Sequence, residues 1–376
     1  MKFIFTESFK LIWNGYTARH DKGISGSHTV SMYLAEGLAK LGHDVIIVNT
    51  TSNVKTVLRT KNRVIKETVY NNNIIEGNYN NVKYVNYNNM SNLSCDYIIT
   101  TNCTDDLNIL NKITDYKKII VIMHNNLYPA GPLLKYHDKT KIIIAFISNV
   151  SKENILNSED NFLKEYDSIL LNNSIDISEI NVNSEKEKSF VYFPCIERGY
   201  KMAVEVIKHF PDFKLYTNTY VDDNRELINQ NQQIILTEDS SKNTIYKYYQ
   251  KSKYFVYPLI NLDTDRIHFD TFGYVVLEAL LHGIVVIAPK MVVNEELFGD
   301  AVCYIDTDDI IPKDDLLHWH KWNPNFGLPI LNRYVEKINL LESDVELYNS
   351  YVEKGLLLKD KYSNITIASN LLNMLN

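Results

Sequence analysis

The stretch from residue 268 to residue 280 constrains the fold more than any other part of this sequence. It reads HFDTFGYVVLEAL and lies between two apolar runs with the composition of β-strands, 254–260 and 283–288. Apolar residues recur within it at helical spacing, which predicts a buried helix over 273–282 between two parallel strands. The apolar positions are Val275, Val276, Ala279 and Leu280. A strand–helix–strand unit of this kind indicates an α/β fold.

Two acidic residues mark this predicted helix. Asp270 precedes the first turn, where backbone N–H groups are free and the helix dipole is positive. Glu278 lies two turns further among the apolar positions, and a buried helix has no routine use for a carboxylate. The two acids could hold two parts of one elongated ligand. The alternative, that Asp270 is an N-cap and Glu278 a paired core carboxylate, stays open because such caps are common.

Length, composition and charge exclude several classes of protein. The 376 residues, 45% of them hydrophobic, are enough for two globular domains. The net charge of −7 argues against a nucleic-acid partner, because phosphate binding needs a basic field. No apolar run approaches the ~20 residues of a membrane span, and residues 1–7 indicate a first strand rather than a signal peptide. The four cysteines form no C-x-x-C pair, so we expect a reduced, cytoplasmic chain without a zinc site.

The first half opens as a strand, a glycine-containing loop, a helix and a strand. The predicted strands are 2–6 and 44–48, and the helix between them ends at Gly42. Gly23 and Gly26 in the loop let a backbone approach a phosphate or a sugar, and the helix N-terminus favours negative charge. A plain turn is the open alternative. A dehydrogenase of the Rossmann type is disfavoured, because a third glycine and an acid after the second strand are both missing.

Further apolar runs continue the parallel pattern in the first half. His124 directly follows one of them, at the sheet edge where ligands bind in such folds. A histidine there can donate to a sugar hydroxyl or a diphosphate oxygen, and Asn125 follows at the same edge. The alternative is a loop histidine that closes a strand end. The predicted strands are 63–69 and 82–85, both placed at the edge of the first sheet, and then 97–100, 118–123, 141–147 and 168–171.

The polar and charged segment 178–188 is interpreted as a hinge into a second domain. That domain again begins with a strand, a loop and a helix, and Arg198 and Lys201 lie at this loop. A guanidinium group can bind two phosphate oxygens, and a lysine adds a point charge, whereas the alternative is a solvated surface pair. The segment 340–376 is helical by spacing. Predicted strands of a second doubly wound sheet are 189–193, 213–217, 233–236, 284–288 and 302–305.

The stretch from Asp270 to Ala279 resembles the acid-x7-acid motif of retaining GT-B glycosyltransferases of group 1, the family typified by sucrose and glycogen-type synthases. The loop with Gly23 and Gly26 is similar to the glycine-rich opening of that family, although His28 stands where many relatives have glutamate. Arg198 stands where the family has a basic residue opposite the donor diphosphate. The arginine usual five residues earlier is replaced by Phe193.

The resemblance implies a GT-B fold: two Rossmann-like doubly wound domains that face a central cleft, with a C-terminal helix crossing back to the first domain. The implied acceptor domain covers residues 1–183 and the implied donor domain covers residues 184–355. The returning helix would cover residues 356–376.

The same resemblance implies retaining transfer of a hexose-type sugar from a UDP- or GDP-type nucleotide sugar to a hydroxyl of a glycan or a small-molecule acceptor. Asp270 and His124 would be the catalytic residues that meet the sugar, and Glu278 would anchor the ribose. The other implied donor-binding residues are Gly23, Gly26, Arg198, Lys201, Phe272 and Gly273. Such an activity belongs to glycan biosynthesis.

No metal or other cofactor is expected. Residues 263–265 and 306–308 match Asp-x-Asp, the metal-binding motif of the other glycosyltransferase fold, GT-A, but an acidic chain acquires such loop triplets by chance. Two alternatives for function stay open: an inactive GT-B protein that binds nucleotide sugars or carbohydrate, and a GT-B sugar-nucleotide epimerase. No transmembrane segment is expected, and a peripheral membrane contact stays open.

Overall fold

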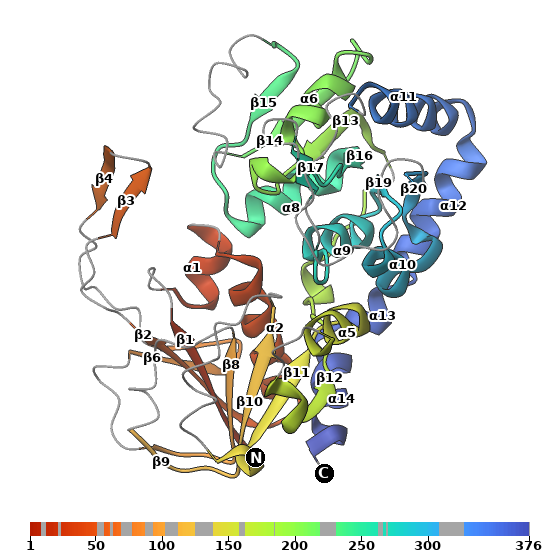
Figure 1. Ribbon diagram of the computed structural model, residues 1–376. Coiled ribbons are helices and arrows are strands. Elements are labelled where there is room, and N and C mark those ends of the chain that lie inside the picture. Colours follow the sequence, from red (N-terminus) through yellow and green to blue (C-terminus); the bar gives the residue numbers. More distant parts are fainter. Residues whose placement is uncertain are drawn as a thin grey trace. The chain divides into compact units, whose positions relative to one another are not determined.

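The chain forms two compact units in the computed structural model (Figure 1). The first unit contains Met1–Ile147, Asp160–Ser174 and Asn364–Asn376, and the second contains Ser148–Glu159 and Ile175–Ser363. The acceptor and donor domains bounded at 183/184 and 355/356 remain predictions. The structure describes residues 1–8, 13–21, 24–50, 56–60, 63–68, 77–86, 93–101, 112–124, 138–157, 162–183, 185–218, 231–261, 266–267, 270–307 and 327–375.

The first unit is built on an eight-stranded sheet. Its strands are β1 (Lys2–Ser8), β2 (Asp44–Thr50), β5 (Gly77–Tyr79), β6 (Val82–Asn86), β8 (Tyr97–Thr101), β10 (Lys118–Met123), β11 (Ile142–Phe146) and β12 (Asp167–Leu170). They stand in the order β12-β11-β10-β8-β1-β2-β6-β5, and β5 alone among these eight is antiparallel to its neighbour. The chain order reverses between β1 and β8, which makes this a topological switch point, where open α/β sheets bind ligands.

The second unit contains a six-stranded parallel sheet. Its strands are β13 (Glu187–Tyr192), β14 (Lys214–Thr217), β15 (Ile234–Leu236), β16 (Ser252–Val256), β19 (Val285–Pro289) and β20 (Cys303–Ile305). They stand in the order β15-β14-β13-β16-β19-β20, with Phe190 opposite Tyr254 and Val256 opposite Ile287. The switch point lies between β13 and β16. Two doubly wound, parallel-dominated sheets confirm the predicted α/β class.

Two predicted strands differ from the structure. β4 (Arg63–Thr68) pairs with β3 (Thr56–Thr60) in a separate antiparallel hairpin, so its predicted place at the edge of the first sheet is wrong. β4 reads RVIKET and carries three charged residues, whereas a buried parallel strand is a continuous apolar run. The predicted strand 254–260 ends at Val256, because Pro258 lacks an N–H for the ladder and Leu259 has a φ of +59°. The remaining short strands are β7 (Leu93–Ser94), β9 (Ile113–Asp115), β17 (Ile260–Asn261) and β18 (Arg266–Ile267).

The C-terminal helix of the chain returns to the first unit, as predicted. The helices of this unit are α1 (Gly15–His20), α2 (Gly26–Lys40), α14 (Asn364–Leu375) and the 3-10 helices η2 (Lys139–Lys141) and η3 (Phe162–Glu165). α14 lies along α2, and a Cβ at Gly37 would overlap the Asn364 carbonyl, so glycine allows this close packing (Figure 1). α1 is fixed to α2 by the buried Arg19, whose Nη2 is 2.8 Å from Glu36 Oε2.

Helices surround the six-stranded sheet of the second unit, as the α/β class requires. They are α5 (Asn149–Leu156), η4 (Ile177–Glu179), η5 (Ile196–Arg198), α6 (Tyr200–Ile207), α8 (Lys242–Lys251), α9 (Tyr274–Leu281), α10 (Val292–Phe298), η7 (Gly299–Ala301), α11 (Gly327–Ser343), α12 (Val345–Leu356) and α13 (Lys359–Tyr362). Within the described residues, no helix of either unit combines the length and the apolar character that crossing a bilayer requires.

Candidate functional site

The start of α9 lies at the carboxyl end of the second sheet, because this helix connects the end of β16 to the beginning of β19. Gly273 is the N-cap residue and has a φ of +72°, in the left-handed region that favours glycine. The loop before it is held by Ser148, whose Oγ donates to the carbonyl of Thr271 at 2.8 Å. Asp270 therefore stands at the mouth of a buried helix beside a topological switch point, where the sequence predicted it.

Asp270 is bound by two other side chains of the second unit. The guanidinium of Arg198 forms an ion pair with Asp270 Oδ1, and the hydroxyl of Tyr257 donates to Asp270 Oδ2 at 2.5 Å. Arg198 Nη1 also donates to the Tyr257 hydroxyl oxygen at 2.7 Å. Asp270 is only 7% exposed, whereas about a third of the Arg198 side chain, 35%, is exposed. Each of the three groups contacts the other two, in a triangle, and Arg198 is the solvent-exposed member.

Three different elements bring this triangle together. Arg198 ends η5, the first helix after β13, and Gly199 with a φ of +110° turns the chain from η5 into α6. Tyr257 directly follows β16, and Asp270 precedes α9. Because β13 and β16 are neighbours at the switch point, their carboxyl ends bring Arg198 and Tyr257 to one place. The N–H of Leu259 donates to the Arg198 carbonyl at 2.9 Å and ties the two loops together.

Glu278 is a buried carboxylate with a buried positive partner. It is 2% exposed and forms an ion pair with Nζ of Lys242, which is 6% exposed and is the first residue of α8. The hydroxyl of Tyr246 donates to the same carboxylate oxygen, Oε1, at 3.0 Å. The ammonium of Lys242 also lies 5.7 Å and 5.4 Å from the ring centroids of Tyr246 and Tyr274. The structural alternative for Glu278, a paired core carboxylate, is therefore realised, and any ribose would share this carboxylate with Lys242 and Tyr246.

His282 lies one turn beyond Glu278 and is fully buried. Its Nδ1 is 2.7 Å from the Glu278 carbonyl, which can only accept, so this nitrogen carries the proton. Burial lowers the pKa of His282 to about 3, so the ring is neutral at physiological pH. Lys186 donates to the carbonyls of His282 and Gln250 at 2.7 Å and 2.8 Å, and thereby links the C-terminal ends of α8 and α9.

The other predicted residues of the second unit have different surroundings. The ring of Phe272 is 2% exposed and packs edge-to-face on Phe298 and Tyr362, with centroids 6.0 Å and 5.7 Å away. A direct role of this side chain with a ligand is therefore less supported than a role of the backbone at Gly273. Lys201 lies in the first turn of α6 and is half-buried. The donor-binding roles of all three residues stay predictions.

The first unit contains the predicted site residues at the N-terminus of α2 and after the end of β10. Gly26 begins α2 after the N-cap residue Ser25, whereas Gly23 lies outside the described residues. Ser25 Oγ is 2.5 Å from Nδ1 of His28, and burial lowers the pKa of His28 to about 4. His124 follows β10 as predicted and is 8% exposed. Burial, with a smaller contribution from His28, lowers the pKa of His124 to about 3, so a neutral imidazole stands at this strand end.

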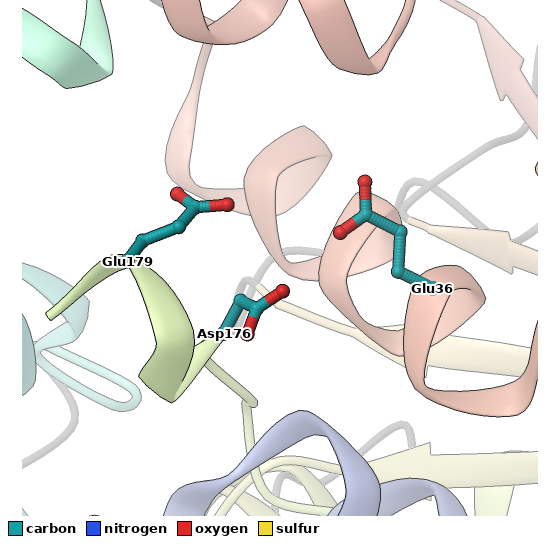
Figure 2. Close-up of side chains that lie close together, drawn as sticks. All are labelled: Glu36, Asp176 and Glu179. Carbon is teal, nitrogen blue, oxygen red and sulfur yellow. The ribbon is translucent and has the colours of Figure 1, made fainter. Parts of the chain in front are cut away.

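Acidic residues outside the triangle have other structural functions. Both carboxylate oxygens of Glu36, on α2, accept hydrogen bonds from the guanidinium of Arg19, at 2.9 Å and 2.8 Å. Asp176 and Glu179 stand at the start and the end of η4, and Asp176 Oδ1 accepts from the Ser178 N–H at 3.0 Å (Figure 2). Of the two Asp-x-Asp triplets, residues 263–265 and Asp308 lie outside the described residues, and the carbonyl of Asp306 accepts from Arg333.

The sequence indicated Asp270, Glu278 and Arg198 as candidate site residues, but it did not indicate Tyr257, Lys242 and Tyr246, which bind the two acids. Tyr257 reads as one more aromatic residue of an apolar strand, and Lys242 and Tyr246 read as part of a polar helix. Only the fold shows that Tyr257 lies beside Asp270 and that Lys242 lies beside Glu278. One signal in the sequence was available for Glu278, because a carboxylate on a buried helix requires a positive or hydrogen-bonding partner.

Comparison with known proteins supports the fold. No protein-family model matches the sequence, and no curated protein matches it. Among solved structures, the sucrose-phosphate synthase of Thermosynechococcus elongatus has a TM-score of 0.67 at 11% identity over 100% of this chain and 98% of that one. The pneumococcal O-GlcNAc transferase GtfA, solved with UDP and GlcNAc, has a TM-score of 0.64 at 12% identity over 100% and 98%. HepE of Anabaena, solved with UDP-glucose, has a TM-score of 0.62 at 12% identity over 100% and 99%. The chain therefore has the GT-B fold over its whole length.

Proposed function

We propose that this protein is a retaining glycosyltransferase that transfers a hexose-type sugar from a nucleoside diphosphate sugar to a hydroxyl of a glycan or a small-molecule acceptor, without a metal. A UDP-type donor is favoured, because two structures with the same fold were solved with UDP or UDP-glucose. The observation that carries the proposal is the Arg198–Asp270 pair at the switch point of the second sheet. It combines a cation suited to a diphosphate with a carboxylate suited to sugar hydroxyls.

The proposed reaction is a displacement at the anomeric carbon. The bond from that carbon to the diphosphate oxygen breaks, and the leaving nucleoside diphosphate takes the electron pair. The acceptor oxygen bonds to the anomeric carbon on the same face, and its proton passes to the leaving phosphate oxygen. Arg198 would stabilise the negative charge that grows on the diphosphate, and Asp270 would orient the sugar hydroxyls. Neutral His124 is proposed as a hydrogen-bond donor to the sugar, and Glu278 as the ribose contact.

A panel of UDP and GDP sugars tests the proposal. We expect one donor to raise the melting temperature of the purified protein and to be hydrolysed slowly without an acceptor. EDTA should not change this rate. With an acceptor, the NMR coupling constant of the anomeric proton in the product should match that of the donor. Asp270→Asn should reduce turnover by at least about a hundredfold, the scale on which the loss of one electrostatic contact acts in a transition state.

The same experiment separates the alternatives. Donor binding without turnover for any acceptor would favour an inactive binding protein, and conversion of the donor into an epimer without an acceptor would favour an epimerase. If neither nucleoside diphosphates nor nucleotide sugars shift the melting temperature, the proposal is wrong.

A further inference from the structure

We propose that Tyr257 is a positioning residue that keeps Asp270 oriented while Arg198 exchanges this carboxylate for the diphosphate of the donor. The inference rests on the function proposed above and extends it to a side chain that the sequence motif does not contain. Arg198 and Asp270 are expected to bind different parts of one ligand, yet in the structure they bind each other.

The direction of each hydrogen bond in the triangle follows from its chemistry. An ionised carboxylate only accepts and a guanidinium only donates. The hydroxyl of Tyr257 therefore gives its one proton to Asp270 Oδ2, at 2.5 Å, and accepts from Arg198 Nη1, at 2.7 Å. Burial raises the pKa of Tyr257 to about 12, so the phenol keeps this proton throughout the neutral range. Tyr257 is thus a constant donor to one oxygen of Asp270, and Arg198 binds the other.

Every polar group of Tyr257 is held in place. The side chain is fully buried, and its backbone N–H donates to the Ile287 carbonyl of β19 at 2.9 Å. Its carbonyl accepts from the hydroxyl of Tyr334 at 3.4 Å. Its ring lies 5.1 Å from that of Phe255, two residues earlier on the same face of the chain. A side chain fixed by the sheet in this way cannot follow a moving partner, which is what positioning a carboxylate requires.

Arg198 is placed differently from Tyr257. A third of its side chain is exposed, and it lies on the short helix η5 rather than in the sheet. A guanidinium can form two parallel bonds with phosphate oxygens, and a diphosphate carries more charge than one carboxylate. Arg198 is therefore the member of the triangle that can change partners when an anionic ligand arrives. Asp270 would then lose its cation and keep the hydrogen bond from Tyr257, with Oδ1 open to a sugar hydroxyl.

The chain just after Tyr257 has an unusual backbone conformation. Pro258 follows it, and Leu259, fully buried, has a φ of +59°, a conformation that leucine rarely adopts. The N–H of Leu259 donates to the Arg198 carbonyl at 2.9 Å. Backbone strain next to a candidate site is typical of positions where the fold imposes a local geometry. Here the strained residue links the turn after Tyr257 to the loop that carries Arg198.

Isothermal titration of UDP and of the donor found in the panel tests the inference in four proteins. Tyr257→Phe removes only the hydroxyl. We expect it to bind UDP within about twofold of the wild type, but to bind and turn over the nucleotide sugar about tenfold to a hundredfold more weakly, the range for a hydrogen bond to a charged group. Arg198→Ala should weaken UDP and the nucleotide sugar together. Tyr254→Phe is the matched control, because this buried tyrosine of β16 binds Glu342 at 2.6 Å instead, and it should behave as the wild type.

The outcomes separate this inference from the proposed function. If Tyr257→Phe loses UDP affinity to the same extent as sugar affinity, or loses neither, Tyr257 does not position Asp270 and the inference is wrong while the proposed function stands. If the wild type binds neither UDP nor GDP, the proposed function itself fails. A second readout guards against a general packing defect: the preference of Tyr257→Phe between donors that are epimers at a sugar hydroxyl should fall about tenfold, whereas a defect in packing alone would weaken both epimers equally.

Discussion

Two buried or half-buried ion pairs define the chemistry of the second unit, and they differ in solvent access. Arg198 is 35% exposed and can leave Asp270 for an anionic ligand. Lys242 and Glu278 are 7% and 3% exposed at their side chains, so neither can leave the other without leaving a buried charge unpaired. The first pair is therefore suited to exchange with a ligand, and the second is suited to holding α8 and α9 together while presenting one carboxylate.

Removing one member of the Lys242–Glu278 pair should be costly. Lys242→Met leaves the Glu278 carboxylate buried without its cation, and we expect a loss of about 3–5 kcal/mol in the free energy of unfolding. The double variant Lys242→Met with Glu278→Leu buries no charge and should recover at least half of that loss. Urea denaturation of both single variants and the double variant gives the coupling energy. A loss below about 1 kcal/mol in Lys242→Met would show that the ammonium does not contribute to folding.

The two ion pairs also show which features of the site could be predicted from the sequence. The spacing of Asp270 and Glu278 was visible because both belong to one helix and its preceding turn. Their partners Arg198 and Lys242 lie 72 and 36 positions away along the chain. Nothing local connects such positions, since only the strand order brings them together. The presence of a partner for Glu278 could be inferred from its burial, but not its identity.

Among the strands, the ends of the buried parallel ones were predicted within a residue or two, except that β16 ends four residues before the predicted end at residue 260. β10 reads KIIVIM and β11 reads IIIAF, and continuous apolar runs of this length are typical of buried parallel strands. β4 was misplaced because a strand of mixed polar and apolar residues fits either a sheet edge or a separate two-stranded ribbon. The membership of α5 in the second unit could not be read from its sequence, because it depends on a contact with α10.

In the contact between α5 and α10, a side chain of α10 caps the N-terminus of α5, although the two helices are far apart in the sequence. The N-terminus of α5 is bound by Glu296 on α10, whose oxygens accept from the N–H groups of Asn149 and Val150 at 2.7 Å and 2.8 Å. Ser148 Oγ accepts from the next N–H, that of Ser151, at 3.0 Å. Three backbone donors of the first turn are thus satisfied, and a carboxylate stands at the positive end of the helix dipole.

Glu296→Ala should therefore loosen α5. We expect a loss of about 1–2 kcal/mol in the free energy of unfolding, the range for losing a cap, together with faster hydrogen exchange of the amides of α5. The neighbouring Glu295→Ala is the matched control, because its ion pair with Lys290 is 3.2 Å long and lies at the surface. That variant should lose less than about 1 kcal/mol. Equal losses in the two variants would contradict the capping role.

The two units of the molecule share one topology. In each, the switch point lies beside the first strand, and a helix begins after that strand or after its neighbour. The sequence predicted this repetition because strand–loop–helix patterns recur in both halves. The function does not follow from the topology alone, since one fold serves many activities. The proposed function rests on Arg198 and Asp270, and the further inference rests on Tyr257, so the experiments use substitutions at these positions.

Each unit contains at least one buried histidine that should make its stability sensitive to acid. Burial lowers the pKa of His28 to about 4, and the pKa values of His124 and His282 to about 3, all from 6.5. Below pH 6.5 the unfolded chain takes up protons that the folded chain does not, so the free energy of unfolding falls as the pH falls towards 4. Each histidine contributes about 1.4 kcal/mol per pH unit in this window. The sign is the reverse of that for a histidine stabilised by a carboxylate.

His282→Asn tests this expectation, because it removes one titrating group while an amide can still donate to the Glu278 carbonyl. Urea denaturation between pH 6 and pH 5 should show a slope about 1.4 kcal/mol per pH unit smaller than that of the wild type. Tyr249→Phe is the control, since its ring lies 5.4 Å from that of His282 and the change adds or removes no group that titrates below pH 7. A wild-type stability that does not change over this window would mean that the histidines are hydrated or paired with acids in the folded protein.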